Sequence, residues 1–206
     1  MNKIVFVNAT AAIKGGALAI LKQFLEGISI YFNENINYYV FCSSEELKTY
    51  ERENIKIIYN IKENNWIDRI RWDFWGLKNW SKRKRMKADL IISFQNTGVF
   101  YYSNINQLIY LHQSIPFCKV VSWDFFNKNE RILWFYKNIY KKLIRFTLKS
   151  NSYIVVQTEC MKNAVVEQFN WNFKKISVIK PKIKDIDVEK ISKIDFNDNE
   201  FHLFYP

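Results

Sequence analysis

The sequence predicts an α/β fold: a Rossmann-like, mostly parallel sheet with helices on both faces. Short apolar runs alternate with longer helical patterns along the 206 residues, as in chains built from βαβ units. Several runs are apolar without polar alternation, which is typical of strands buried on both faces. Hydrophobic residues make up 49% of the chain, with only 5 glycines and 3 prolines, which excludes a disordered or collagen-like protein.

The expected elements follow one another in a regular order. Strands are expected at residues 3–7, 38–42, 55–59, 89–94, 108–111, 153–156 and 176–179. Helices are expected at residues 17–31, 45–52, 66–86, 130–149 and 159–169. Ser43 and Glu46 have the spacing of a capping box, and Thr158 stands at an N-cap position. Right-handed crossovers would wind these units into one sheet.

The C-terminal part departs from this pattern. Residues 182–200 are polar and charged and resemble a linker between domains. The strand-like residues 201–206 cannot bury both faces alone, so they either pair with the sheet edge or open a second domain. The linker favours the second interpretation. We therefore expect a domain at 1–181, a linker at 182–200, and at 201–206 the first strand of a domain that this chain lacks, with His202 structural.

The net charge of +11, from 31 basic and 20 acidic residues, implies a polyanionic partner: nucleic acid, an anionic membrane surface or a phosphorylated substrate. Two segments carry the excess. Residues 66–87 hold four of the seven tryptophans, eight basic residues and two acidic ones, and residues 130–150 hold six basic residues and one acidic one. The rest of the chain is neutral overall.

Aromatic rings with a basic fringe are typical of a helix in the headgroup layer of a membrane. For 130–150, apolar residues at helical spacing favour packing on the sheet instead; these are Ile132, Phe135, Ile139, Leu143 and Phe146. The composition would also suit stacking on single-stranded nucleic acid, but no nucleic-acid-binding motif accompanies it, which disfavours that partner. For 66–87 we favour contact with an anionic membrane or a lipid-linked acceptor, through Trp66, Trp72, Trp75, Trp80, Lys82, Arg83, Lys84 and Arg85.

Several kinds of site and location are disfavoured. The three cysteines are far apart in the sequence and form no CxxC pair; they are Cys42, Cys118 and Cys160. We therefore expect free thiols in a reducing cytoplasm. We also expect that the protein binds no metal and no cofactor. No run approaches 18 apolar residues, and the N-terminus lacks a secretory signal pattern. The expected location is the cytoplasm, peripheral at the inner face of the membrane.

Gly15 and Gly16 follow the first strand and precede a helix. Glycines there let the backbone approach a ligand, and free N–H groups at a helix start favour phosphate or another anion. An ordinary turn is the alternative. The sequence does not match the dinucleotide-binding motif GxGxxG, because Ala17 and Ile20 stand at two of the glycine positions. It also lacks the Gly-Lys-Ser/Thr sequence of a P-loop. NAD binding and NTP hydrolysis are therefore disfavoured.

His112 stands where the strand at 108–111 ends. Ligands of open α/β sheets bind at the carboxyl ends of strands, so His112 would share a crevice with the Gly15–Gly16 turn. It could donate a hydrogen bond to a sugar or phosphate oxygen or act as an acid or base, or simply satisfy loop carbonyls. Thr158 and Glu159 reach the same edge, either as helix-capping residues or as substrate contacts.

Taken together, four pieces resemble the N-terminal domain of GT-B glycosyltransferases, specifically glycosyltransferase family 4. They are KIVFV (3–7) leading into KGGA (14–17), YLHQSIPF (110–117), YIVVQTECMK (153–162) and KISVIKP (175–181). The resemblance implies the acceptor-binding half of a retaining hexosyltransferase that uses a nucleotide-sugar donor and no obligatory metal. The implied acceptor is a lipid-linked glycan or a growing surface polysaccharide of bacteria. Because the resemblance covers only the acceptor-binding half, this chain is expected to be inactive alone.

The resemblance also implies roles for individual residues. Gly15 and Gly16 would approach the donor diphosphate or the acceptor, and His112 would be the catalytic residue beside the transferring sugar. Thr158 and Glu159 would flank the acceptor, and Gln113 replaces an aspartate of many relatives. The rival hypothesis is a non-catalytic basic module that binds anionic lipid or nucleic acid.

Overall fold

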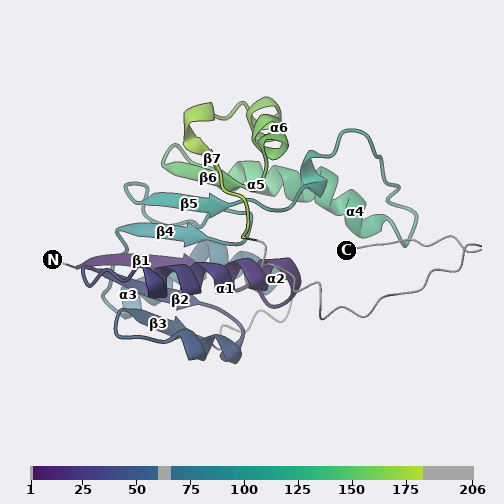
Figure 1. Cartoon of the computed structure of the whole chain (residues 1–206). Helices are drawn as coiled ribbons and strands as arrows, with labels where there is room; N and C mark the ends of the chain where they lie inside the picture. The colour runs from purple at the N-terminus through teal and green to yellow at the C-terminus, as the bar shows by residue number, and fades with distance from the viewer. Residues whose placement is uncertain (1, 60–65, 183–206) are drawn as a thin grey trace, which may run out of the picture.

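The computed structural model describes residues 2–59 and 66–182 (Figure 1). Almost all of the expected linker, the expected strand at 201–206 and His202 lie outside the described residues.

Seven strands form a single sheet in the order β3-β2-β1-β4-β5-β6-β7, and every neighbouring pair is parallel. This is the Rossmann order extended by one strand, and it confirms the predicted α/β fold. Each expected strand is present. The strands are β1 (Lys3–Asn8), β2 (Ile36–Phe41), β3 (Ile55–Ile58), β4 (Leu90–Ser93), β5 (Asn106–Tyr110), β6 (Ser152–Val156) and β7 (Ile176–Val178).

The expected helices are also present, two of them with a π-helical turn in the middle. The first three helical segments are α1 (Gly15–Ile30), the 3₁₀ helix η1 (Glu45–Tyr50), and α2 (Trp66–Arg71) with η2 (Trp72–Gly76) and α3 (Leu77–Arg83). The later ones are η3 (Ile115–Phe117), α4 (Arg131–Phe135) with η4 (Tyr136–Tyr140) and α5 (Lys141–Thr147), α6 (Glu159–Phe169) and η5 (Phe173–Lys175). The π turns are η2 and η4.

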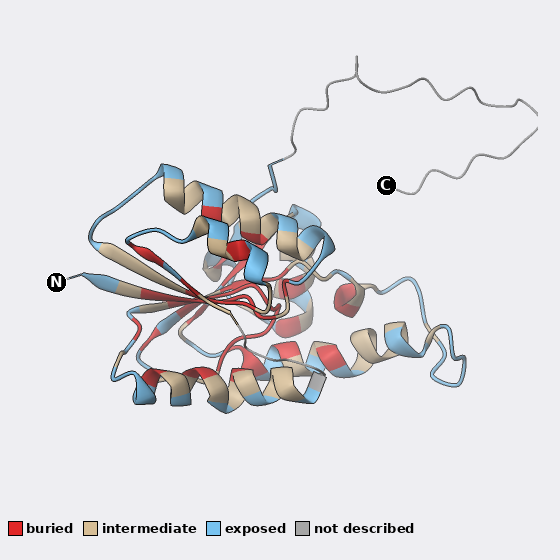
Figure 2. Cartoon of the chain, turned by 90° about the horizontal axis from the view of Figure 1, so that it is seen from below, coloured by how far each residue is buried: buried red, intermediate tan, exposed pale blue. Residues whose placement is uncertain are grey.

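Helices cover both faces of the sheet because alternate strand residues point to opposite sides. On one face α1 and η1 pack over Val5 and Val7. On the other, α3 packs over Phe6, and α5 and α6 pack over Ile109 and Ile154 (Figure 1). The buried residues therefore concentrate along the strands between two helical layers (Figure 2).

The two capping predictions have different outcomes. Thr158 caps α6 as predicted, because its Oγ1 accepts the N–H of Met161 at 3.2 Å. The capping box at Ser43 and Glu46 is wrong. The Ser43 hydroxyl donates instead to the carbonyl oxygen of Thr10 at 2.8 Å, and η1 begins after Ser44 without a side-chain cap.

Phe6 supplies a test of the core. It is fully buried, and the rings of Tyr39, Phe41, Trp80 and Tyr101 meet it edge-on at centroid distances of 5.4 to 6.1 Å. We expect Phe6→Ala to lower the free energy of unfolding by about 3–5 kcal/mol in urea titrations, because the cavity cannot close. The exposed Phe126 is the matched control, and Phe126→Ala should change stability by less than about 0.5 kcal/mol. Equal effects would contradict this core assignment.

Candidate functional site

A cavity of about 510 Å³ opens at the carboxyl edge of the sheet, the edge at which open α/β sheets bind ligands. The chain therefore brings the glycine turn and the strand-end histidine to one crevice, as the parallel topology predicts. Its lining residues are Gly16, Ala17, Ala19, Ile20, Gln23, His112, Gln157 and Pro181.

The amino end of α1 forms one wall. The helix begins at Gly15, whose φ of +62° is a conformation that favours glycine. A Cβ at Gly15 or Gly16 would meet no atom of the described chain within 4 Å, so packing does not require these glycines. Lys14 at the N-cap makes no side-chain capping bond, and the first turn carries no acidic residue. The first backbone N–H groups of α1 thus lack a side-chain cap at the cavity rim and suit an anion.

His112 is held from two sides. Its backbone N–H donates to Asn96 Oδ1 at 2.8 Å, and the N–H of Gln113 donates to the same oxygen at 3.0 Å. The imidazole stacks on the Tyr110 ring at a centroid distance of 5.8 Å. Its Nδ1 is buried, and no described residue hydrogen-bonds to it. The ring is therefore positioned from both sides at the cavity wall, and its buried Nδ1 has no partner among the described residues.

The environment keeps the imidazole neutral. Burial, and secondarily the positive charge of Arg69, lower the pKa of His112 below its ordinary value of 6.5. A neutral imidazole carries one hydrogen-bond donor and one acceptor, which suits sugar hydroxyls.

The other expected contacts are placed differently. Thr158 and Glu159 are exposed at the start of α6, where Thr158 serves as the cap, and neither they nor Gln113 line the cavity. Gln157 does line it, and its Nε2 donates to Tyr110 Oη at 2.7 Å. Sequence reasoning missed Gln157, although it directly follows a buried strand whose carboxyl end points to this edge.

A buried polar network lies at the carboxyl ends of β1 and β4. The Asn8 side chain is its centre: Nδ2 donates to Asp73 Oδ1 at 2.8 Å. Asn8 Oδ1 accepts from Trp72 Nε1 at 2.9 Å and from Gln95 Nε2 at 3.0 Å. Sequence reasoning missed this network. The available signal was a run of polar residues directly after two buried strands.

Arg69 extends the network to the helix that follows β5. Its Nε donates to Gln95 Oε1 at 2.7 Å, and its Nη2 donates to Tyr140 Oη at 3.1 Å. The Tyr140 hydroxyl donates to the Gln95 carbonyl oxygen at 2.9 Å, and burial raises the pKa of Tyr140. Because Arg69 also lowers the pKa of His112, the network contributes to the electrostatics of the cavity.

Two tryptophans of residues 66–87 that were expected to contact a membrane, Trp72 and Trp80, are half-buried against the aromatic core. Trp72 lies 5.6 Å from the Phe41 ring, and Trp80 lies 4.8 Å from it and 5.6 Å from Phe6. Both indoles pack into the aromatic core because the core supplies ring partners and, for Trp72, an acceptor on Asn8.

The other described members of that segment do not line the cavity. Trp75 is exposed, and the side chain of Trp66 lies outside the described set. An exposed basic cluster follows at the end of α3, just before β4 begins and hence at the amino edge of the sheet, opposite the cavity; it consists of Lys82, Arg83, Lys84 and Arg85.

The second aromatic segment is only partly packed. Phe135 and Leu143 are half-buried against the core, as expected. Ile132, Ile139 and Phe146 are instead 62%, 40% and 60% exposed.

No helix within the described ranges has the length and apolarity needed to cross a bilayer. In the same residues, no three side chains of His, Cys, Asp or Glu converge as metal ligands do. Cys42, Cys118 and Cys160 are free thiols.

No protein-family model matches the chain, and no curated protein matches it. Among solved structures, the chain is similar to the apo form of the lipopolysaccharide outer core galactosyltransferase WaaB, with 16% sequence identity and a TM-score of 0.47. The match covers 90% of this chain and 47% of that chain. It is also similar to Alr3699/HepE of Anabaena in complex with UDP and glucose, with 12% identity, coverages of 89% and 45%, and a TM-score of 0.44. The chain spans about half the length of each.

The His112 environment predicts a pH dependence. In the unfolded chain His112 titrates near 6.5, and in the folded chain it titrates lower. Between these values the unfolded state binds more protons, so folding stability falls as the pH drops below about 6.5. NMR titration should give a His112 midpoint below 6.5, assigned with His112→Gln, and that variant should lose this component of the pH dependence. A midpoint at or above 6.5 would contradict the buried placement.

The Asn8 network predicts a stability cost. We expect Asn8→Ala to lower the free energy of unfolding by about 2–3 kcal/mol, because buried groups of Asp73, Trp72 and Gln95 lose a partner. Chemical denaturation monitored by circular dichroism measures this. Asn79→Ala, at an exposed site on α3, is the control and should be nearly neutral. A neutral Asn8→Ala would rule out the network as a stabilising element.

Proposed function

We propose that this chain is the N-terminal, acceptor-binding half of a GT-B glycosyltransferase similar to family 4, which transfers a sugar from a nucleotide-sugar with retention of configuration. The observation that carries the proposal is the shared cavity, lined by Gly16 at the uncapped start of α1 and by the imidazole of His112. An anion site and a neutral hydrogen-bonding imidazole side by side suit a substrate with both phosphate and hydroxyl groups.

In the proposed reaction, the bond between the anomeric carbon and the diphosphate oxygen breaks. A bond from that carbon to an acceptor hydroxyl forms, and the hydroxyl proton leaves with the released diphosphate. The N–H groups of α1 would bind phosphate oxygens, and His112 would hydrogen-bond to the transferring sugar. The Gln157 amide would contact a further hydroxyl from the opposite wall, with Gln113, Thr158 and Glu159 in more peripheral contacts.

The path of the chain supports a donor-binding domain after this one. The Gln23 side chain donates to the Lys182 carbonyl oxygen at 2.7 Å and accepts the Lys182 N–H at 3.2 Å, and Pro181 lines the cavity. Residues beyond Lys182 therefore start at the cavity rim. We propose residues 182–200 as the linker and 201–206 as the first strand of that domain.

The proposed acceptor is a lipid-linked or growing surface polysaccharide, used at the cytoplasmic face of the membrane.

Transfer assays on the product of the complete reading frame test the proposal, with a panel of nucleotide-sugars and with lipid-linked and oligosaccharide acceptors. We expect His112→Ala to lower kcat/KM at least about 100-fold, as for loss of a group that acts on the reacting centre. Lys128→Ala, at an exposed loop position, should retain full activity. Full activity of His112→Ala, or no transfer from any nucleotide-sugar, would refute the proposal.

Calorimetry tests the division into halves. Residues 1–206 alone should bind nucleotide-sugars with a Kd weaker than about 1 mM and transfer no sugar. Tight binding by this chain would contradict the proposed donor half, and a purely basic binding module would bind anionic vesicles without any sugar-dependent signal.

A further inference from the structure

Asn96 lies in the loop that follows β4, where it is buried in an unusual backbone conformation. Its φ is +63°, in the left-handed region that residues other than glycine rarely adopt. Two further described residues share this conformation, Arg85 and Asn170, but both lie at the end of a helix, where it is common. Asn96 follows a strand instead. A buried residue held in such a conformation between a strand and a loop indicates a specific task.

That task is visible where the pairing of β5 with β6 stops. The N–H of Leu111 still donates to the Val155 carbonyl oxygen at 2.8 Å. The next two N–H groups, of His112 and Gln113, both donate to Asn96 Oδ1, at 2.8 and 3.0 Å. An amide oxygen has two lone pairs, so this one side chain receives both donors. Asn96 therefore fixes the backbone from which the imidazole projects.

The loop around Asn96 is itself anchored to the long helical segment at 131–147. The carbonyl oxygen of Gln95 accepts the Tyr140 hydroxyl at 2.9 Å. On the other side of Asn96, the N–H of Gly98 donates to Thr147 Oγ1 at 2.9 Å. Both partners belong to the same helical segment, in η4 and α5. The two anchors hold the backbone on either side of Asn96, so its side chain has little freedom to move.

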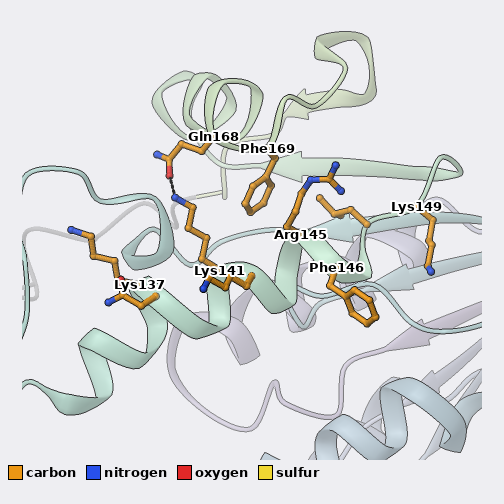
Figure 3. A pocket seen from close by; sticks show the side chains of 10 residues that line it. Lys137, Lys141, Arg145, Phe146, Lys149, Gln168 and Phe169 are labelled. Carbon is orange, nitrogen blue, oxygen red and sulfur yellow. Dashed lines mark hydrogen bonds between the residues drawn. The ribbon is translucent and has the colours of Figure 1, made fainter. Parts of the chain in front are cut away.

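The same helical segment is connected to the far end of the loop that carries His112. Lys141 follows Tyr140 directly, points toward α6 and hydrogen-bonds to Gln168 Oε1 (Figure 3). Gln168 Nε2 in turn donates at 2.9 Å to the carbonyl oxygen of Phe117, the last residue of η3. The loop from His112 to Phe117 is thus held at both ends, by Asn96 at its start and by α6 at its end.

Asn96 does not line the candidate cavity, so it acts on the site through the backbone of His112. Displacing a reacting group by about 1 Å can cost about 100-fold in rate. We propose that Asn96 is a positioning residue of the transfer reaction, whose Oδ1 sets the place of the His112 imidazole at the cavity wall. The consequence for catalysis rests on the proposed function, whereas the positioning is a property of this chain alone.

Amide hydrogen exchange tests the positioning without any substrate. Asn96→Gly is the sharpest variant, because glycine adopts a φ of +63° without strain and the change removes the acceptor. In the 206-residue chain, exchange at His112 and Gln113 should become at least about 10-fold faster, whereas exchange at Leu111 should change less than about twofold. Unchanged exchange at His112 and Gln113 would overturn the proposal, whatever the activity.

A matched control makes the same substitution in the same backbone conformation. Asn170→Gly replaces an exposed asparagine with a φ of +50° at the end of α6, and it should leave exchange at His112 and Gln113 unchanged. Faster exchange at both amides in this control, equal to that in Asn96→Gly, would indicate general loosening of the chain and would overturn the proposal.

A conservative variant keeps the test decisive if Asn96→Gly does not fold. Asn96→Asp retains an oxygen acceptor at the same place, so exchange at His112 and Gln113 should stay within about threefold of that in the original chain. Circular dichroism verifies that each variant is folded. Loss of protection at both amides in folded Asn96→Asp would show that the oxygen does not hold the turn, and would overturn the proposal.

A double-mutant cycle in the product of the complete reading frame tests the catalytic consequence. Asn96→Gly should lower kcat about 10- to 100-fold and change KM less than about threefold. In a His112→Ala background the same change should cost less than about twofold, because Asn96 acts through His112. Equal losses in both backgrounds would overturn the positioning role. Absence of transfer in every protein would refute the proposed function alone, because the exchange rates still decide the role of Asn96.

Discussion

The buried Asn8 side-chain amide joins three parts of the chain that are far apart in sequence: the end of β1, the helix at 66–83 and the loop after β4. Buried polar groups are costly unless bonded, so these parts have to assemble together. The loop after β4 includes Asn96, which accepts the backbone N–H groups of His112 and Gln113. The geometry of the candidate site therefore depends on residues that do not line it.

The positions of strands and helices could be predicted because they follow from local hydrophobic pattern, and the meeting of Gly16 with His112 followed from parallel topology alone. The Asn8 network could not be predicted in this way. Asn8, Asp73 and Gln95 come from three different elements, and no periodicity relates them. Ser43 shows the same difficulty on a smaller scale. A capping serine accepts a backbone N–H, whereas the Ser43 hydroxyl donates to the Thr10 carbonyl oxygen, a tertiary contact that the local sequence does not reveal.

The two aromatic and basic segments have similar compositions, but different shares of their large apolar side chains pack on the core. Trp72 and Trp80 find ring partners in the core, whereas Ile132, Ile139 and Phe146 remain exposed. Each segment contains a π turn, and the extra residue rotates everything after it by about 100° around the helix axis. A helical pattern in the sequence assumes a constant angle per residue and does not anticipate such a turn. The turn does not by itself decide which residues pack, because Ile132 before η4 is exposed and Leu143 after it packs on the core.

The paired hydrogen bonds between Gln23 and Lys182 fix the point from which the following residues extend. Gln23 also lines the candidate cavity, so one side chain of α1 contributes both to the cavity wall and to the position of Lys182. A change in the shape of the cavity at Gln23 would therefore shift the backbone at Lys182, and a displacement of Lys182 would in turn alter the cavity.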